Sequence, residues 1–229
     1  MHITYLGHAC FTIETNGVKV LIDPFLKSNP KYFAQLWELA KQPDYILITH
    51  GHGDHVGDVI ELATDNKATV ISNYEICNWL NSKGVNNCID LNMGSTLLKE
   101  GIEIRMVTAI HSSSIECEAG NIYAGLACGY MIKTDNEVVY HAGDTCLFSD
   151  MKLLNELYKP TIGLLPIGGR FTMNMDETVY ACNNFFTFKT VIPMHYDTFP
   201  PISANVKELQ AKLKNTSVCV LEVGKNIEI

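Results

Sequence analysis

Long hydrophobic runs, paired cysteines and an excess of basic residues are all missing from this sequence of 229 residues. No apolar stretch approaches the roughly 20 residues that a helix needs to cross a bilayer, so we expect no membrane span. The opening MHITYLGHACF lacks the basic region and the apolar core of a signal peptide, and it has the composition of a strand. We therefore expect an intracellular, cytoplasmic protein.

The eight cysteines are scattered without a CxxC pair, which argues against a zinc ribbon or a disulfide framework. We expect most of them to be reduced and buried as small apolar residues. The chain has 17 Lys and Arg against 25 Asp and Glu, a formal net charge of -8. Nucleic-acid binders concentrate basic residues, so we expect a small-molecule substrate and no nucleic-acid partner. The composition leaves homo-oligomerisation open.

Strands and helices interleave along the chain after an opening rich in strands. HITYL, ACFTIET and VKVLID have strand composition, and Asn16-Gly17 between the last two predicts a hairpin. LACGYMIKT and EVVYHAG are expected to pair across Asp135-Asn136, and later helices are expected near 147–158 and 204–213. Without a low-complexity linker, residues 1–229 are predicted to form a single domain. An α/β fold, a four-layer alpha/beta-beta/alpha sandwich with two mixed sheets face to face, accommodates this order.

A dense cluster of metal-binding residue types follows the strand DYILIT. His50-Gly51-His52-Gly53-Asp54-His55 places three imidazoles and a carboxylate in six residues. Imidazole nitrogen and carboxylate oxygen bind zinc and related divalent metals, and glycines let one loop turn tightly enough to supply several ligands. His50 and His52 project from one side if the strand direction continues, which suits one metal, while Asp54 and His55 beyond the bend suit a second. A His-rich surface loop is the alternative, which this ligand density disfavours.

The pattern HxHxDH directly after a strand resembles the metallo-beta-lactamase superfamily. Three later residues match its remaining ligand motifs in order and context: His111 ends MVTAIH, Asp144 lies in YHAGDT and His195 lies in VIPMHY. Taken alone, each would more often be a partly buried histidine or a turn residue than a ligand. The resemblance implies that Asp144 bridges two metals, with His50, His52 and His111 on one and Asp54, His55 and His195 on the other.

A narrower resemblance covers nearly the whole chain. GHACF, VKVLIDPF, LLPIGG and VIPMHYDTFP are similar to a subfamily of predicted metal-dependent hydrolases related to L-ascorbate-6-phosphate lactonase. This resemblance implies two divalent ions, zinc with manganese, nickel or iron as alternatives, and a metal-activated water that attacks a small ester, lactone or phosphoester. Asp54, Asp144 and His8 are the expected catalytic residues, with Asp54 orienting the water and His8 acting as an extra ligand or a proton carrier.

Other functions and other residues stay open at this stage. A phosphodiesterase or nuclease and a non-catalytic metal-binding protein are the alternatives to the hydrolase. Asp23 is expected either to accept an N–H from a metal-loop histidine or to form a plain turn. His141 is expected to support the site or to pack, and Arg170 either to bind an anionic group or to be solvated. Cys146 stands where a glycine is frequent in the family, and we expect it to be a packed free thiol.

Overall fold

The computed structural model describes residues 1–99, 101–134 and 136–229. It consists of two compact units that are each built from separate stretches of the chain. Unit 1 comprises residues 1–92, 112–127 and 221–229, and unit 2 comprises residues 93–111 and 128–220. The prediction of a single domain stays a prediction.

Unit 1 contains a mixed seven-stranded sheet with the strand order β16-β1-β2-β3-β4-β5-β6. β1, β2, β3 and β16 are antiparallel neighbours, whereas β3, β4, β5 and β6 are parallel. A separate two-stranded hairpin, β9 with β10, belongs to the same unit. The strands are β1 (His2–Gly7), β2 (Cys10–Thr15), β3 (Val18–Ile22), β4 (Tyr45–Leu47), β5 (Thr69–Asn73), β6 (Cys88–Leu91), β9 (Ser114–Ile115), β10 (Ile122–Tyr123) and β16 (Asn226–Glu228).

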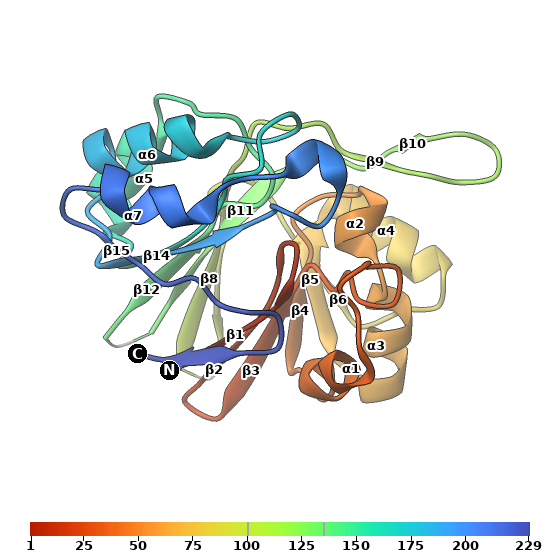
Figure 1. Ribbon diagram of the computed structural model, residues 1–229. Coiled ribbons are helices and arrows are strands. Elements are labelled where there is room, and N and C mark those ends of the chain that lie inside the picture. Colours follow the sequence, from red (N-terminus) through yellow and green to blue (C-terminus); the bar gives the residue numbers. More distant parts are fainter. Residues whose placement is uncertain (100, 135) are drawn as a thin grey trace. The chain divides into compact units, whose positions relative to one another are not determined.

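Helices cover the sheet of unit 1 (Figure 1). Apolar side chains of α1, α3 and α4 pack with those of the strands in one core, for example Leu36, Leu62 and Leu80 against Ile46 and Val70, all fully buried. Burying such side chains contributes roughly 1.5–3 kcal/mol each. The packed core therefore gives the loops that follow these strands a rigid support. The helices are α1 (Ala34–Ala40), α2 (Gly53–Val56), α3 (Val59–Asn66) and α4 (Tyr74–Ser82).

Unit 2 contains a second mixed seven-stranded sheet, with the order β15-β14-β13-β12-β11-β8-β7. β12, β13, β14 and β15 are parallel, and the remaining neighbours are antiparallel. The strands are β7 (Thr96–Lys99), β8 (Ile102–Thr108), β11 (Cys128–Lys133), β12 (Val138–His141), β13 (Ile162–Pro166), β14 (Thr190–Met194) and β15 (Ser217–Val218).

Helices α5, α6 and α7 pack on this second sheet through a core that includes Tyr140, Leu165, Met151, Ala181 and Leu209. A capping box precedes α6: the side chain of Asn174 accepts the backbone N–H of Glu177, and the side chain of Glu177 accepts the backbone N–H of Asn174. The helical elements are α5 (Met151–Tyr158), α6 (Met175–Asn184), the 3-10 turns η1 (Pro200–Ile202) and η2 (Val206–Glu208), and α7 (Leu209–Lys212).

The hairpin predicted at Asn16-Gly17 is confirmed, because Thr15 pairs with Val18 and both turn residues have positive φ. The second predicted hairpin also pairs, β11 with β12, although Asp135 in its turn lies outside the described residues.

Two predicted helix boundaries were wrong. The helix expected near 147–158 is α5, which begins only at Met151, after a turn in which the N–H of Met151 donates to the carbonyl of Phe148. The helix expected from Ala204 begins later, as η2 and then α7, because the Ala204 N–H donates to the Asp197 carboxylate. Among the described residues, no helix combines the length and the apolar character required to cross a membrane.

Candidate metal centre

The candidate residues of unit 1 follow the carboxyl ends of strands that run in the same direction. β3 and β4 are parallel, and β1 has the direction of β3 because each is antiparallel to β2. The residues after these strands, His8, Asp23 and Thr49-His50, therefore collect at one edge of the sheet, which is where side chains that bind ligands are commonly placed in such sheets. The sequence thus brings residues that are 42 positions apart to one place.

Three candidate ligands in unit 1 lie within reach of one ion. A ligand atom from each of His8, Asp54 and His55 lies within 4.8 Å of the others. The Nε2 of His8 is 3.0 Å and the Nε2 of His55 is 3.9 Å from the Oδ2 of Asp54. His8 is 1% exposed and has a φ of 59°, a region that few residues other than glycine occupy. The irregular end of β1, where the register shifts before Gly7, directs this side chain inward.

The two histidines of the predicted first pair also converge. The Nε2 of His50 lies 3.0 Å from the Nδ1 of His52, and the ring centroids are 4.6 Å apart. His50 is fully buried, while His52 is half-buried at the start of α2. Two imidazole nitrogens at this separation match the spacing of two ligands on one metal with bonds of about 2.0–2.1 Å.

Asp23 forms hydrogen bonds to the metal loop, which is one of the two roles predicted for it. Its fully buried carboxylate accepts a hydrogen bond from the Nδ1 of His55 at 2.8 Å and another from the backbone N–H of Thr49 at 2.8 Å. Donation from Nδ1 leaves the lone pair of His55 on Nε2, the atom near Asp54. The prediction that Asp23 accepts a histidine N–H is therefore confirmed, and the carboxylate orients a candidate ligand in the manner typical of metal sites.

In unit 2, two candidate histidines lie close to the carboxylate of a third candidate ligand, Asp144. The Oδ2 of Asp144 lies 3.0 Å from the Nε2 of His195 and 3.6 Å from the Nε2 of His111. Asp144 is 3% and His195 is 2% exposed, so both polar groups are held out of water. His195, directly after β14, has a φ of 53° and, like His8, lies in the left-handed region. Strained backbone of this kind persists where surrounding contacts fix it, frequently at functional sites.

The turn that carries Asp144 is fixed by its neighbours. His141 is fully buried and accepts the N–H of Gly143 through Nδ1 at 3.2 Å, so it stabilises the turn before Asp144. Thr145 accepts the N–H of Ile110 at 3.0 Å, which ties the segment before His111 to the same turn. These bonds fix the position of the Asp144 carboxylate relative to the segment that carries His111.

The close contacts of two glycines near these residues were not predicted, because close backbone approach leaves no pattern in a single sequence. A Cβ on Gly168 would lie 2.2 Å from the carbonyl oxygen of His195. A Cβ on Gly51 would lie 2.5 Å from the side chain of Ala124, where the β9–β10 hairpin packs on the metal loop. Both positions therefore require glycine for contact rather than for a turn.

Three other expectations can be compared directly with the structure. The prediction that Cys146 is packed was wrong: the residue is exposed, because its N–H is bonded to the carbonyl of Ile110 and this turn directs the side chain outward. Arg170 is exposed at the tip of a tight turn with its guanidinium 5.5 Å from the ring of Phe171, which matches the solvated alternative. Only four of the eight cysteines are buried, so the expectation that most are buried was too broad.

The donor set fits divalent metal ions. All seven predicted ligands offer imidazole nitrogen or carboxylate oxygen, and within each unit they converge to distances that ligands on one ion can adopt. The mixture of nitrogen and oxygen suits zinc and also manganese, nickel or iron, so the residues do not select one metal.

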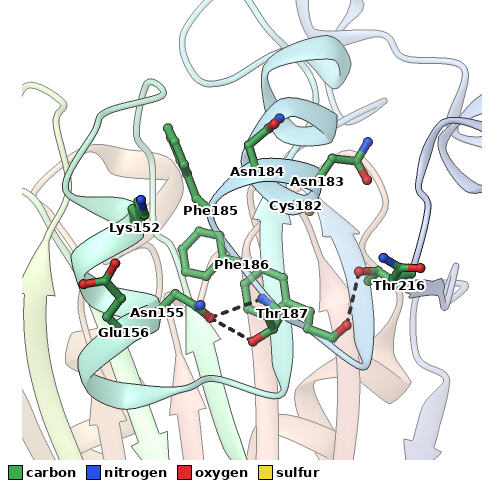
Figure 2. A pocket seen from close by; sticks show the side chains of 12 residues that line it. Lys152, Asn155, Glu156, Cys182, Asn183, Asn184, Phe185, Phe186, Thr187 and Thr216 are labelled. Carbon is green, nitrogen blue, oxygen red and sulfur yellow. Dashed lines mark hydrogen bonds between the residues drawn. The ribbon is translucent and has the colours of Figure 1, made fainter.

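A cavity of about 420 Å³ in unit 2 lies apart from these residues (Figure 2). It is lined by α5, the end of α6 and the loop before β14, and it therefore lies near the amino ends of the parallel strands, opposite Asp144 and His195. Its central amide, the Oδ1 of Asn155, already accepts the N–H and the hydroxyl of Thr187. Nothing in its chemistry connects it with hydrolysis.

Comparison with known proteins identifies the family. The model of the beta-lactamase superfamily domain matches residues 2–195. A UPF0173 metal-dependent hydrolase of Methanopyrus kandleri is 44% identical over the full length of both chains. The solved structure of Igni18, a metallo hydrolase from Ignicoccus hospitalis, is 36% identical, covers 99% of this chain and 97% of its own, and has a TM-score of 0.87.

The fold agrees with a more distant structure as well. The metallo-beta-lactamase fold protein YhfI from Bacillus subtilis, only 12% identical, covers 99% of both chains with a TM-score of 0.76. The predicted α/β fold and the prediction of a metal-dependent hydrolase are confirmed at this level, whereas the link to ascorbate-6-phosphate lactonase finds no support in these comparisons. The family match and the full-length identity together show that the chain belongs to the beta-lactamase superfamily, among the metal-dependent hydrolases.

Proposed function

We propose that this hydrolase cleaves a small ester, lactone or phosphoester with the help of two divalent metal ions. The observation that carries the proposal is the convergence of imidazole and carboxylate groups at strand ends, in the order that the family motif has along the sequence. The proposed ligands, with Asp144 shared by both ions, are His50, His52 and His111 for one ion and Asp54, His55 and His195 for the other.

Bound metals would supply positive charge that acidifies a water molecule and polarises the bond to be cleaved. The residues of the chain prepare the site for that charge. Asp144 is a buried carboxylate close to the imidazoles of His111 and His195, and burying its charge is costly unless a cation neutralises it. Asp23 fixes the ring of His55 so that its Nε2 is presented.

Within the proposed mechanism, Asp54 and His8 form the pair that can hold a proton. Their side chains are 3.0 Å apart, and the His8 ring packs edge-on to Phe25 at a centroid distance of 5.6 Å. His8 thus has a fixed orientation toward Asp54, and we propose that it orients this carboxylate. Replacement of His8 by Gln keeps a hydrogen-bonding group next to Asp54 but removes the imidazole. If His8 is a metal ligand, the metal content of this variant should be lower; if His8 only orients Asp54, the metal content should stay the same.

A hydrolysis panel tests the proposal and narrows the substrate class. Metal-loaded protein is assayed with aryl esters, lactones, phosphomonoesters and phosphodiesters, alongside Asp144→Asn. Turnover of an ester, a lactone or a phosphomonoester by the wild type, lost in the variant, supports the proposal. Turnover of phosphodiesters alone would identify a phosphodiesterase, and no turnover of any class by fully metal-loaded protein would favour the non-catalytic alternative.

A further inference from the structure

A threonine between the buried carboxylate and the metal loop has a role that the family motif does not assign. Thr49 is fully buried and forms two hydrogen bonds to Asp23. Its backbone N–H donates to Oδ1 at 2.8 Å, and its hydroxyl lies 2.7 Å from Oδ2. The same hydroxyl oxygen lies 3.0 Å from the Nδ1 of His50.

The direction of these hydrogen bonds follows from counting hydrogens. The Thr49 hydroxyl has one hydrogen, and the Asp23 carboxylate and the Nδ1 of His50 both lie within hydrogen-bonding distance of its oxygen. An ionised carboxylate only accepts, so the hydroxyl must donate to Asp23. The Nδ1 of His50 must then carry its own hydrogen and donate it to the hydroxyl oxygen. This places the lone pair of His50 on Nε2, the atom that faces His52.

We infer that Thr49 is a positioning residue that sets the tautomer of His50, so that one buried carboxylate orients two candidate metal ligands by different routes. Asp23 acts on His55 directly through the 2.8 Å bond from Nδ1, and it acts on His50 through the Thr49 hydroxyl. The two rings lie 4.0 Å apart between centroids. This inference rests on the proposed function, in which His50 and His55 bind different ions.

The two hydrogen bonds from Thr49 to Asp23 fix the orientation of the hydroxyl, which donates to Asp23 and accepts from His50. Because the backbone N–H and the side chain of Thr49 bond different oxygens of Asp23, the side chain cannot rotate without losing a bond to a buried carboxylate. The hydroxyl therefore keeps a lone pair directed at His50 whether or not an ion is present. A ring held in this way loses less freedom on binding a metal, which is how groups that support metal ligands raise affinity.

The test compares two substitutions of equal bulk or equal chemistry. Thr49→Val keeps the shape and removes the hydroxyl, whereas Thr49→Ser keeps the hydroxyl. Thr12→Val is the matched control, because Thr12 is a buried threonine of β2 in the same unit. Long-range proton–nitrogen NMR of ¹⁵N-labelled, metal-free protein reads the tautomer of His50, which is assigned with a His50→Gln variant.

We expect the Nδ1–H tautomer of His50 in the wild type, in Thr49→Ser and in Thr12→Val, and a loss of that preference in Thr49→Val. Zinc titration should show one binding event weakened by about 10–100-fold in Thr49→Val only. An unchanged tautomer in Thr49→Val, or a Thr49→Ser variant as weak as Thr49→Val, would overturn the inference. If the wild type binds no metal, the proposed function fails, while the tautomer measurement on metal-free protein still decides the inference.

Discussion

Replacing Asp23 by Asn should destabilise the folded chain strongly even without metal. The carboxylate is fully buried and accepts three hydrogen bonds, two on Oδ2 from the hydroxyl of Thr49 and the Nδ1 of His55 and one on Oδ1 from the backbone N–H of Thr49. An amide has only one acceptor oxygen. In its better orientation this oxygen replaces Oδ2 and keeps two bonds, and the NH₂ group then faces the backbone N–H of Thr49.

The magnitude follows from that mismatch. Two buried donors, the amide NH₂ and the Thr49 N–H, would face each other without an acceptor, and each unsatisfied buried group costs about 1–3 kcal/mol. The free energy of unfolding of Asp23→Asn should therefore fall by about 2–6 kcal/mol. Because whole-domain stability is typically about 5–15 kcal/mol, we expect a folded but much weakened protein.

Denaturant unfolding in the presence of a chelator measures this effect apart from metal binding. Asp44→Asn is the matched control: Asp44 is exposed, its Oδ2 accepts one bond from the N–H of Lys19 at 2.7 Å, and an amide oxygen can accept the same bond. The control should stay within about 0.5 kcal/mol of the wild type. A free energy of unfolding for Asp23→Asn equally close to the wild type would refute the assigned hydrogen bonds.

Three further predictions concern other parts of the chain. Gly168→Ala should lower the free energy of unfolding by about 1–3 kcal/mol and reduce metal content, because the new Cβ would meet the carbonyl of His195; wild-type values for both would contradict the contact. The hydrogen bond from Lys189 lowers the pKa of Glu137, so its contribution is present at neutral pH and is lost as the pH falls through that lowered pKa. Lys189→Met should therefore cost under about 1 kcal/mol at pH 7 and nothing measurable well below the lowered pKa of Glu137, in unfolding titrations on both sides of that pKa. Metal at 100 times its dissociation constant should add about 2.7 kcal/mol per site to the unfolding free energy measured in chelator, and an unchanged value would mean that folding and metal binding are not linked.

The sequence predicted those elements of the fold whose structure depends only on neighbouring residues. The hairpin at Asn16-Gly17 needs positive φ at both residues, which this pair adopts readily, and the structure has it. Edge strands such as β6 and β7 were missed, because their residues are largely half-buried or exposed and lack the alternation of a strand with one buried face. Such strands form through pairing with a neighbour rather than through their own composition.

The candidate site also has residues that a local sequence pattern predicts and residues whose roles depend on the fold. The HxHxDH spacing predicted four candidate ligands because they are close together in the sequence and form a local pattern, and Asp23 was predicted from its place after an apolar strand. The roles of Thr49 and Gly168 could not be found, since a hydroxyl relay and a close backbone approach depend on residues that only the fold brings together. The left-handed backbone of His8 arises from the irregular end of β1, which no residue type there announces.

The most direct test of the proposed metal centre is the metal content of the purified chain. Protein prepared without added metal, and again after zinc loading and gel filtration, is measured by elemental analysis for the wild type and for Asp144→Ala, with folding checked by circular dichroism. We predict close to two metal ions per wild-type chain and a clear loss in the folded variant. A folded wild type with no metal after loading, or a variant that retains two ions, would contradict the proposed centre.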